Sequence, residues 1–247
     1  SIMVCEAPRE SAASIILPAS IVWLIGFDES EEFSSSSASK FLQITSEYCL
    51  VLSTVVSLTI SMFAFTEIVS LSQRHELEID WKPVLVGGVF NAVNHDVYEF
   101  RKKPNPLKLN YSNDDLSLWS KVRGVSINFP KIFPVNSVRV MRGCLFANQE
   151  SKMVEFANNV FQAYWSESKD ISKEDVVLSI AENSNLDTEK FKKFITSKEA
   201  KKVLKRNTDE LIRRGGFGSP TFFYKEKMFF GNDRLHLLED AIVKNLI

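Results

Sequence analysis

The 247-residue sequence predicts an α/β protein in which one mixed sheet is divided by a long helical insertion. Apolar and polar side chains alternate in residues 77–82, which is the period of a β-strand, and residues 221–230 are typical of two short strands around a Lys-Glu-Lys turn. Between these stretches, residues 112–212 repeat their apolar side chains with the spacing of amphipathic helices. A β-α-β unit, a helical insertion and a closing β-β-α unit account for this order.

The front unit begins in residues 48–66, a stretch without any charged side chain. We expect residues 50–56 to form the first strand and residues 63–75 the following helix, because a central strand that feeds a buried helix is apolar throughout. The 19 uncharged residues are also close to the length of a membrane span. Six of them are Ser or Thr, and this content favours the strand and helix over a membrane anchor.

The helical insertion and the last unit contain recognisable starts and stops. Ser112, with an aspartate three residues later, resembles a capping box, and its helix is expected to stop at Gly124. Apolar side chains in residues 153–165 follow the i, i+3, i+4, i+7 spacing of one helix face, so buried packing is their expected role. Strands at 221–224 and 228–230 then form a hairpin before a final helix.

These elements divide the chain into three expected parts. Residues 1–46 form a poorly structured N-terminal tail, because they contain an acidic, Ser-rich stretch with the composition of a linker. Residues 47–90 and 213–247 form the domain that contains the sheet, and residues 91–212 form an inserted helical domain.

Composition argues against several classes of partner and cofactor. Lys and Arg (30) nearly balance Asp and Glu (31), so no overall basic field favours nucleic acid. The basic residues within 190–206 are interleaved with glutamates, which is typical of a solvated helix face. Three cysteines without a C-x-x-C pair argue against a disulfide framework and a dithiol centre, and three scattered histidines argue against a metal site. We therefore expect neither a metal nor a nucleic-acid partner.

The segment GFGSPTFF, residues 216–223, carries the strongest chemical signal. Its glycines lack the Lys-Ser or Lys-Thr of a phosphate-binding P-loop. A proline cannot donate a hydrogen bond within a sheet, so Pro220 belongs at the first residue of its strand. A cis Ser219–Pro220 bond would aim the backbone groups of Ser219 at the space beside the sheet edge, where a peptide-like ligand can pair with them.

Six motifs together carry a resemblance to a known family. They are GFGSPTFF, FFGNDRLHLLEDAI, WKPVLVGGVF, DLSLWS, FPVNSVRVMR and NNVFQAYW, and the resemblance runs from about Phe63 to the C-terminus. Together they resemble the family of 2-hydroxychromene-2-carboxylate isomerases and kappa-class glutathione transferases, within the DsbA-like branch of the thioredoxin fold. The resemblance implies a thioredoxin-like mixed sheet with a large inserted all-helical domain, and glutathione bound at the sheet edge beside a cis-proline.

The resemblance implies glutathione-binding roles for residues at two turns. Pro220 matches the cis-proline, and Ser219 matches the residue whose backbone holds the cysteinyl part of glutathione. The G-x-D-R turn that receives the γ-glutamyl end is matched by Asn232, Asp233 and Arg234. Physical chemistry supports this role, because N–H groups at a helix start favour a carboxylate and Asp233 can accept a hydrogen bond from an ammonium group.

Two further contacts follow from the resemblance. Lys108 matches a lysine that lies near the glycine end of glutathione. Relatives often carry an asparagine shortly after GGVF, and here Asn94 or His95 takes that place. Both residues stay candidates for this contact.

The family's catalytic element, S-P-[FY]-[SA]-[YF], has two candidate positions in this chain. By local pattern the serine is Ser61, with Met62 in place of the proline; by spacing back from Trp81 the position is Leu58, next to Ser57. The serine hydroxyl and the positive end of the helix would lower the pKa of the glutathione thiol, and the thiolate is the nucleophile. No cysteine stands at either position, so the dithiol chemistry of DsbA-type oxidoreductases is not expected.

The resemblance implies a glutathione-dependent isomerase or transferase that acts on an electrophilic, aromatic-type small molecule. Glutathione is the implied cofactor, and a homodimer is compatible with the resemblance because relatives are commonly dimers. The alternatives are a catalytically impaired glutathione-binding relative, a DsbA-like protein without a C-x-x-C centre, and a membrane-anchored protein that uses residues 48–66. We expect a cytoplasmic protein, with a mitochondrion or another organelle as the alternative.

Overall fold

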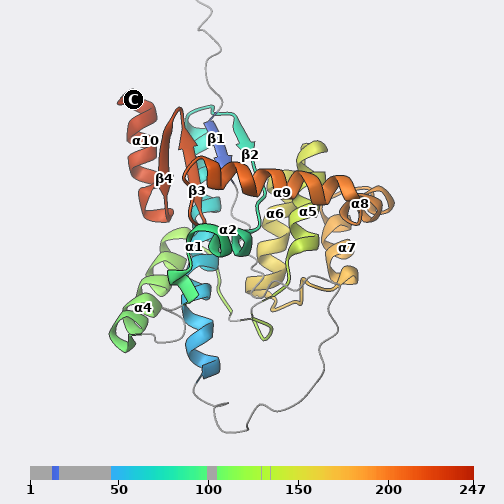
Figure 1. The fold of residues 1–247 in the computed structure, drawn as a ribbon, viewed down its shortest axis with the longest axis horizontal. Helices are drawn as coiled ribbons and strands as arrows, with labels where there is room; N and C mark the ends of the chain where they lie inside the picture. The colour runs from blue at the N-terminus through green and yellow to red at the C-terminus, as the bar shows by residue number, and fades with distance from the viewer. Residues whose placement is uncertain (1–12, 17–45, 99–104, 129, 134) are drawn as a thin grey trace, which may run out of the picture.

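The computed structural model describes residues 13–16, 46–98, 105–128, 130–133 and 135–247, with side chains described from residue 59 onward. Within these residues, a small sheet lies between helices from both halves of the chain (Figure 1). In this view α10 lies beside β4, α9 crosses in front of the sheet, and α5 to α8 gather on the β2 side.

The sheet has four strands in the order β2-β1-β3-β4. β1 runs parallel to β2 and antiparallel to β3, and β3 forms an antiparallel hairpin with β4. This mixed sheet agrees with the predicted fold class. The strands are Ala13–Ile16 (β1), Ile79–Trp81 (β2), Thr221–Tyr224 (β3) and Lys227–Phe230 (β4).

The first strand differs from the prediction. Residues 50–56 lie within α1 (Ser46–Arg74), a helix of 29 residues, and the central strand is β1 instead. An uncharged apolar stretch fits a strand and a buried helix equally well, and α1 contains no Pro or Gly that would stop it. β1 comes from the region expected to be a tail, and the rest of that prediction, in 1–12 and 17–45, lies outside the described residues. In the described part of the chain, no helix is both long and apolar enough to cross a membrane.

The predicted helical insertion lies between β2 and β3. Its borders with the sheet-containing domain stay a prediction. After β4, the chain closes with a short 3-10 helix η2 (Asn232–Arg234) and α10 (Leu235–Val243). The described helices between β2 and β3 are α2 (Val86–Val93), α4 (Pro106–Arg123), α5 (Val138–Gln149), α6 (Met153–Phe161), the π-helical η1 (Gln162–Ser166), α7 (Glu174–Asn183), α8 (Thr188–Ile195) and α9 (Lys198–Arg213).

Helix α4 begins earlier than the sequence predicts. The side-chain oxygen of Asn105 accepts a hydrogen bond from the backbone N–H of Leu107 (2.9 Å), and Pro106 occupies the first helical position. The predicted start at Ser112 is therefore wrong, because its hydroxyl lies inside the helix and donates to a backbone carbonyl one turn earlier. The predicted end at Gly124 is confirmed, since this residue adopts a left-handed φ of 63°.

One hydrophobic core joins the sheet to the inserted helices. Phe65 of α1 is only 2% exposed, and its ring centroid lies 5.5 Å from that of Trp81 in β2 and 5.4 Å from that of Phe161 in α6. Tyr164 and Trp165 of η1 are also buried, with their ring centroids 5.0 Å apart. The aromatic side chains of the predicted helix at 153–165 therefore serve packing, as expected.

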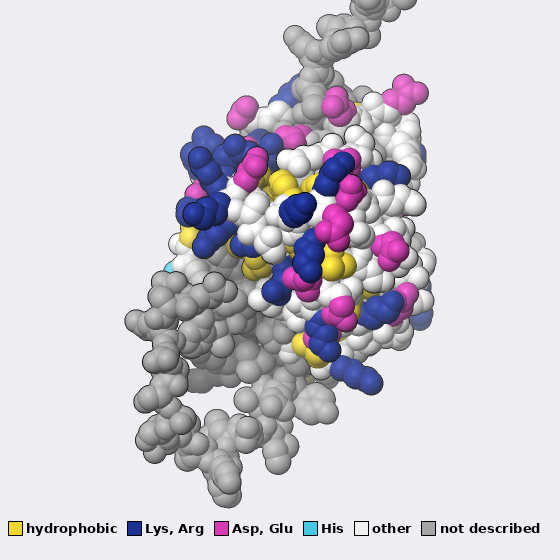
Figure 2. Space-filling model, turned by 90° about the vertical axis from the view of Figure 1, so that its right-hand side faces the viewer, with side chains coloured by type: hydrophobic (Ala, Val, Ile, Leu, Met, Phe, Trp, Pro, Cys, Tyr) yellow, Lys and Arg dark blue, Asp and Glu magenta, His cyan; other side chains and the backbone are white. Residues whose placement is uncertain are grey.

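The basic stretch at 190–206 lies on α8 and α9 and is balanced by acidic neighbours. Lys192 Nζ lies 2.8 Å from Glu174 Oε1, and Lys205 Nζ lies 2.6 Å from Asp209 Oδ2. Figure 2 shows Lys and Arg side chains interspersed with Asp and Glu over one face of the molecule. These ion pairs favour the interpretation of this stretch as a solvated helix surface.

Candidate functional site

Two serines that are far apart in the sequence meet beside the sheet. The hydroxyl Oγ of Ser61, on α1, lies 3.4 Å from the Oγ of Ser219, in the loop before β3. Both residues are buried, with 0% and 4% of their surface exposed. The candidate serine chosen by local pattern therefore lies next to the residue predicted to hold the cysteinyl part of glutathione. The other candidate, Ser57, lies one turn earlier on α1, and its side chain is outside the described atoms.

Ser61 does not lie at the start of a helix. It sits in the middle of α1, where backbone N–H groups bond to carbonyls of the same helix, so the predicted positive helix end beside the serine is wrong. Met62 explains the difference. Proline fits the first turn of a helix and breaks a helix interior, so the proline of the family motif marks a helix start, whereas methionine lets α1 continue upstream.

The loop before β3 contains the Ser219–Pro220 bond and is held by two hydrogen bonds, one within the loop and one to the turn after β4. The Ser219–Pro220 peptide bond is cis, as predicted. The hydroxyl of Thr221 donates to the carbonyl of Gly218 (2.8 Å), and the N–H of Gly231 donates to the carbonyl of Pro220 (3.0 Å). The second bond ties this loop to the turn after β4, so both predicted binding turns lie at the same end of the β3–β4 hairpin.

Gly218 allows an aromatic ring to lie against this loop. A Cβ atom at this position would lie 3.1 Å and 3.3 Å from two ring carbons of Phe230. Phe230 packs against Phe217 with ring centroids 4.5 Å apart, and the two residues are 36% and 38% exposed. The loop therefore presents a pair of partly exposed rings close to the Ser219–Pro220 bond.

Three further residues are predicted candidates for contact with glutathione: Asn94 and His95 after α2, and Lys108 in α4. Asn94 Nδ2 donates to the backbone carbonyl of Phe217 (2.9 Å), so Asn94 contacts the loop that leads to Ser219. His95 is exposed. Lys108 is exposed in the first turn of α4, a helix that packs along α1. Their contacts with glutathione stay predictions.

The turn after β4 begins at Gly231, whose φ of 101° is a conformation that favours glycine. Asn232 is 3% exposed. Asp233 and Arg234 are exposed, and Arg234 Nη1 lies 2.7 Å from Asp233 Oδ2. The three predicted binding residues of this turn are therefore one buried amide and one exposed ion pair.

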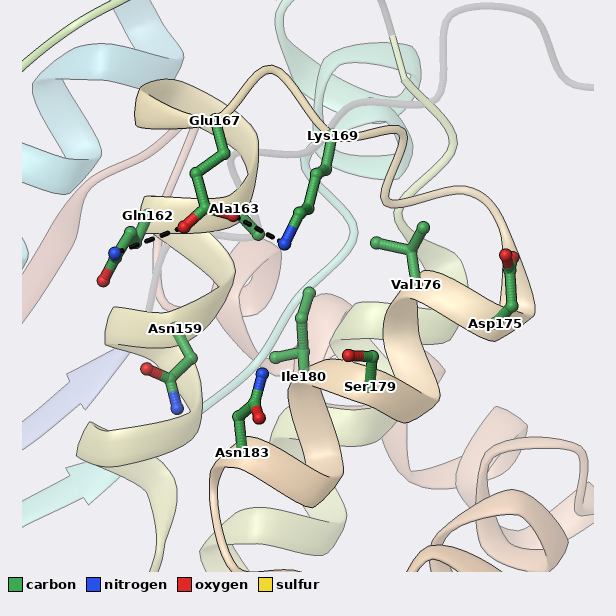
Figure 3. A pocket seen from close by; sticks show the side chains of 10 residues that line it. All are labelled: Asn159, Gln162, Ala163, Glu167, Lys169, Asp175, Val176, Ser179, Ile180 and Asn183. Carbon is green, nitrogen blue, oxygen red and sulfur yellow. Dashed lines mark hydrogen bonds and ion pairs between the residues drawn. The ribbon is translucent and has the colours of Figure 1, made fainter.

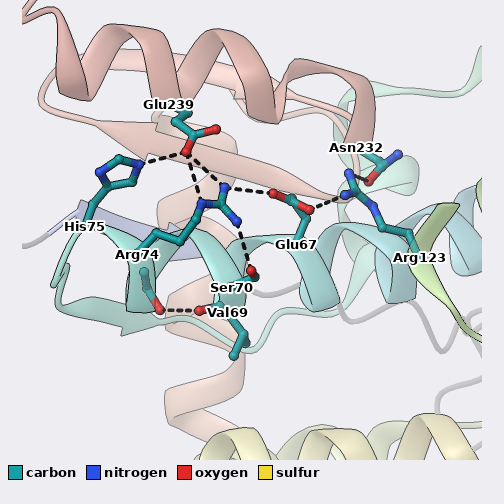
Figure 4. A network of polar contacts seen from close by, with 9 residues as sticks. Glu67, Val69, Ser70, Arg74, His75, Arg123, Asn232 and Glu239 are labelled. Atoms are coloured by element: carbon teal, nitrogen blue, oxygen red, sulfur yellow. Dashed lines mark hydrogen bonds and ion pairs between the residues drawn. The ribbon is translucent and has the colours of Figure 1, made fainter.

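A chain of ion pairs runs behind this turn (Figure 4). Arg123, at the end of α4, pairs with Glu67 on α1, and Glu67 also lies 3.0 Å from Arg74. Arg74 and His75 both contact the Glu239 carboxylate on α10, at 2.9 Å and 2.7 Å. The chain of ion pairs therefore links α1, α4 and α10 around the predicted binding turn.

Burial and hydrogen bonds shift the pKa of several of these groups. Burial lowers the pKa of the Arg123 guanidinium, and the charge of Glu67 opposes this effect. Hydrogen bonds from His75 and Arg74 hold the pKa of the Glu239 carboxyl below its ordinary value. Hydrogen bonds to Glu239 and Glu67 raise the pKa of Arg74.

No local sequence pattern marks Asp115 or Arg123 as site residues. The pKa of Asp115 is raised, first by burial and then by the negative charge of Asp233, while a hydrogen bond with Trp119 opposes the rise. The carboxylates of α4 and of the turn therefore act on each other. In the sequence, Asp115 looks like a helix-capping residue, and Arg123 has partners that are 56 and 109 positions away.

A hollow of about 350 Å³ lies in the inserted helices, between α6, η1 and α7 (Figure 3). Lys169 Nζ pairs with Glu167 Oε2 beside it (2.6 Å), and Gln162 donates to the same carboxylate (3.3 Å). None of the predicted site residues lines this hollow, so the predicted glutathione site does not coincide with it. Its lining consists of Asn159, Gln162, Ala163, Glu167, Lys169, Asp175, Val176, Ser179, Ile180 and Asn183.

A comparison with known protein families agrees with the thioredoxin-like fold. A family model described as a DSBA-like thioredoxin domain matches residues 60–243. The match begins one residue before Ser61 and ends with α10. The resemblance predicted from the motifs and the thioredoxin-like fold class are both confirmed.

Several curated relatives bear the name 2-hydroxychromene-2-carboxylate isomerase. The one from Pseudomonas putida is 32% identical over 136 residues, which cover 55% of this chain and 66% of the relative. The one from Pseudomonas sp. strain C18 is 31% identical over 136 residues, which cover 55% of this chain and 63% of the relative. The chain thus matches just under two thirds of the length of these two relatives. A glutathione s-transferase kappa 2 from Caenorhabditis elegans is 24% identical over 198 residues, which cover 74% of this chain and 87% of the relative.

Solved structures agree with these sequence matches. A 2-hydroxychromene-2-carboxylate isomerase superposes with a TM-score of 0.65 at 27% identity, covering 76% of this chain and 90% of that chain. A probable DsbA oxidoreductase from Streptomyces coelicolor superposes with a TM-score of 0.56 at 10% identity, which shows the shared fold alone.

Proposed function

Because this chain belongs to the family of DSBA-like thioredoxin domains, and its relatives are named as isomerases and as a kappa glutathione transferase, we propose that it is an enzyme that uses glutathione. In this proposal bound glutathione supplies a thiolate that attacks an electrophilic, aromatic-type small molecule. The observation that carries the proposal is the buried pair of hydroxyls formed by Ser61 and Ser219 beside Pro220.

The serine pair can stabilise a thiolate. A hydroxyl that donates a hydrogen bond to the charged form of a thiol lowers the thiol pKa, and more thiolate is then present at neutral pH. Ser61 sits in the middle of α1, so no helix end adds to this effect. The hydroxyls of Ser61 and Ser219 therefore have to supply the stabilisation themselves.

The ends of glutathione have chemically matched partners in the proposal. Its γ-glutamyl end would lie at η2, where Asp233 accepts a hydrogen bond from the ammonium group. Burial raises the pKa of Asp115, and the negative charge of Asp233 raises it further. An ammonium group held by Asp233 would oppose this second effect. The backbone of Ser219 would pair with the cysteinyl part, and Lys108 would meet the glycine carboxylate.

The partly exposed rings of Phe217 and Phe230 support an aromatic-type substrate. Aromatic faces bury a flat ring well and favour offset or edge contacts with it. In an isomerisation, the thiolate sulfur would add to a carbon of a conjugated double bond and turn it into a single bond, with the electron pair held as an enolate. Rotation about that bond and loss of the thiolate would then give the isomer and regenerate glutathione. In a transfer, the sulfur would stay bound to the product and glutathione would be consumed.

A titration with glutathione tests the proposal. We expect glutathione to raise the unfolding temperature in a saturable way, because a ligand that binds the folded chain stabilises it. The same protein should then conjugate glutathione to an aryl halide faster than buffer does. Absence of any stabilisation by glutathione would contradict the proposal.

A second candidate function is favoured by one observation. Ser61 lacks the helix start that the family motif marks with proline, so the chain could hold glutathione and no longer activate its thiol. In that case glutathione would still raise the unfolding temperature of the protein. The thiol pKa of bound glutathione would equal that of free glutathione. A lowered thiol pKa in the complex would exclude this second function.

A further inference from the structure

Arg123 connects three parts of the molecule that bear predicted site residues. Its Nη2 donates to the side-chain oxygen of Asn232 (3.1 Å), and its Nη1 pairs with Glu67 (Figure 4). Arg123 belongs to α4, Glu67 to α1 and Asn232 to η2. The Arg123 side chain is only 13% exposed, so water competes little for these contacts.

The chemistry of the guanidinium fixes which way the Asn232 amide faces. A guanidinium group has donors only, so it has to meet the oxygen of the amide and not its nitrogen. The Nδ2 donor of Asn232 then faces away from Arg123, and it is buried without a hydrogen-bond partner in the described part of the chain. A buried donor without a partner destabilises the folded state.

An aspartate at position 232 would keep an oxygen for Arg123 and would make this hydrogen bond charge-assisted. It would replace the unpartnered donor with a second carboxylate oxygen. It would also place a second carboxylate beside Asp233, at the turn that the proposed function gives to the γ-glutamyl end, whose own carboxylate carries the same charge. The neutral amide of Asn232 avoids this repulsion of an anionic group.

We propose that Arg123 is a positioning residue, which holds the neutral amide of Asn232 and thereby fixes the turn at 231–234 for the anionic end of a ligand. The inference rests on the proposed function for the identity of that ligand, glutathione. The contacts with Asn232 and Glu67 set the position of the turn relative to α1, which carries Ser61.

Arg123→Lys tests the positioning role without removing the positive charge. The lysine ammonium lacks the planar guanidinium that contacts Glu67 and Asn232 in a fixed geometry. The turn at 231–234 would then be held less firmly, so we expect the backbone amides of Gly231 and Arg234 to exchange with deuterium faster. We expect glutathione to bind about tenfold more weakly, which is about 1.4 kcal/mol. Arg139→Lys is the matched control, because that arginine donates to the backbone carbonyl of Ser172, before α7, and not to the turn at 231–234.

The variant Asn232→Asp tests separately for effects on glutathione affinity and on the stability of the fold. We expect the unfolding temperature to equal or exceed that of the natural chain, while the affinity for glutathione falls about tenfold or more because like charges meet at the turn. Asn183→Asp, on the exposed surface of α7, is the control that adds the same charge elsewhere.

Amide exchange and glutathione affinity, measured on both variants, together support or overturn the inference. Faster exchange at the turn together with weaker glutathione binding in Arg123→Lys supports it, and so does a stable Asn232→Asp protein that binds poorly. Unchanged exchange overturns it. Faster exchange with unchanged affinity also overturns it, since Arg123 would then support the fold alone. If the natural chain does not bind glutathione, the proposed function fails, and the exchange at Gly231 and Arg234 alone decides whether Arg123 positions the turn.

Discussion

The imidazole Nε2 of His75, the residue after α1, lies 2.7 Å from Oε1 of Glu239 on α10. Arg74 contacts the same carboxylate oxygen at 2.9 Å. These hydrogen bonds lower the pKa of Glu239 below its ordinary value of 4.5, so the carboxylate stabilises the folded chain when it is charged.

This contact predicts how stability responds to acid. A lowered folded-state pKa gives stability that is present above pH 4.5, the unfolded-state value, and is lost as the pH falls through the folded-state value. Glu239→Gln should therefore reduce the unfolding temperature at neutral pH and have less effect in acid. Thermal unfolding followed by circular dichroism over a series of pH values measures both effects. Glu226→Gln, on the exposed turn between β3 and β4, is the control; an equal pH response in both variants would contradict the prediction.

Removal of the Phe65 ring should strongly destabilise the chain. Phe65 packs against Trp81 and Phe161, so Phe65→Ala leaves a cavity between the sheet and the insertion. We expect a loss of about 3 to 5 kcal/mol in the free energy of unfolding, measured by urea titration. Leu107→Ala serves as the control, because Leu107 is 79% exposed and its loss should change stability by less than about 0.5 kcal/mol. A Phe65→Ala loss as small as that of the control would show that this packing does not hold the two parts together.

Gly218→Ala should disturb the loop that carries the cis bond. The new Cβ would lie 3.1 Å from the Phe230 ring, so the ring or the loop has to move, at a cost of about 1 to 3 kcal/mol. Gly88→Ala is a matched change in α2, where the Cβ meets only ordinary contacts and a helix-favouring residue should stabilise by about 0.5 to 1 kcal/mol. The two variants should therefore shift the urea midpoint in opposite directions, and equal shifts would contradict the close approach of Phe230.

Ser61→Ala should affect chemistry more than binding. If the hydroxyl supports the glutathione thiolate, its removal raises the thiol pKa in the complex and moves the pH–rate profile for conjugation to higher pH. The turnover rate at neutral pH should fall about tenfold to a hundredfold, whereas glutathione affinity changes little. Ser57→Ala, one turn earlier on α1, should leave the profile in place. A shifted profile in Ser57→Ala and not in Ser61→Ala would reverse the assignment of the two serines.

Local sequence signals predicted the C-terminal unit well. The strand at 221–224 and its hairpin partner, the proline at the first residue of a strand, and the turn at 231–234 all depend on neighbouring residues in the chain. Ser61 is one of two candidates for the catalytic serine because its motif is short and continuous, and its role stays a prediction.

The features that the sequence missed depend on long-range contacts or on an ambiguous pattern. Residues 50–56 are apolar and uncharged, which suits a strand and a buried helix equally, and the competing strand at 13–16 lay in a region without its own periodic signal. Arg123 looked like an ordinary basic residue at a helix end. Only folding brings it to Glu67 and Asn232, so no local pattern could mark it.

The place of β1 in the sheet has a consequence for how the chain can be divided. β1 is bonded to β2 on one side and to β3 on the other, so among the described strands it alone joins β2 to the β3–β4 hairpin. The stretch at 60–243 that matches the family model does not include this strand. A truncated chain limited to that stretch would expose two unpaired strand edges, which are sites of self-association. In this chain, the stretch at 60–243 therefore depends on β1 for a continuous sheet.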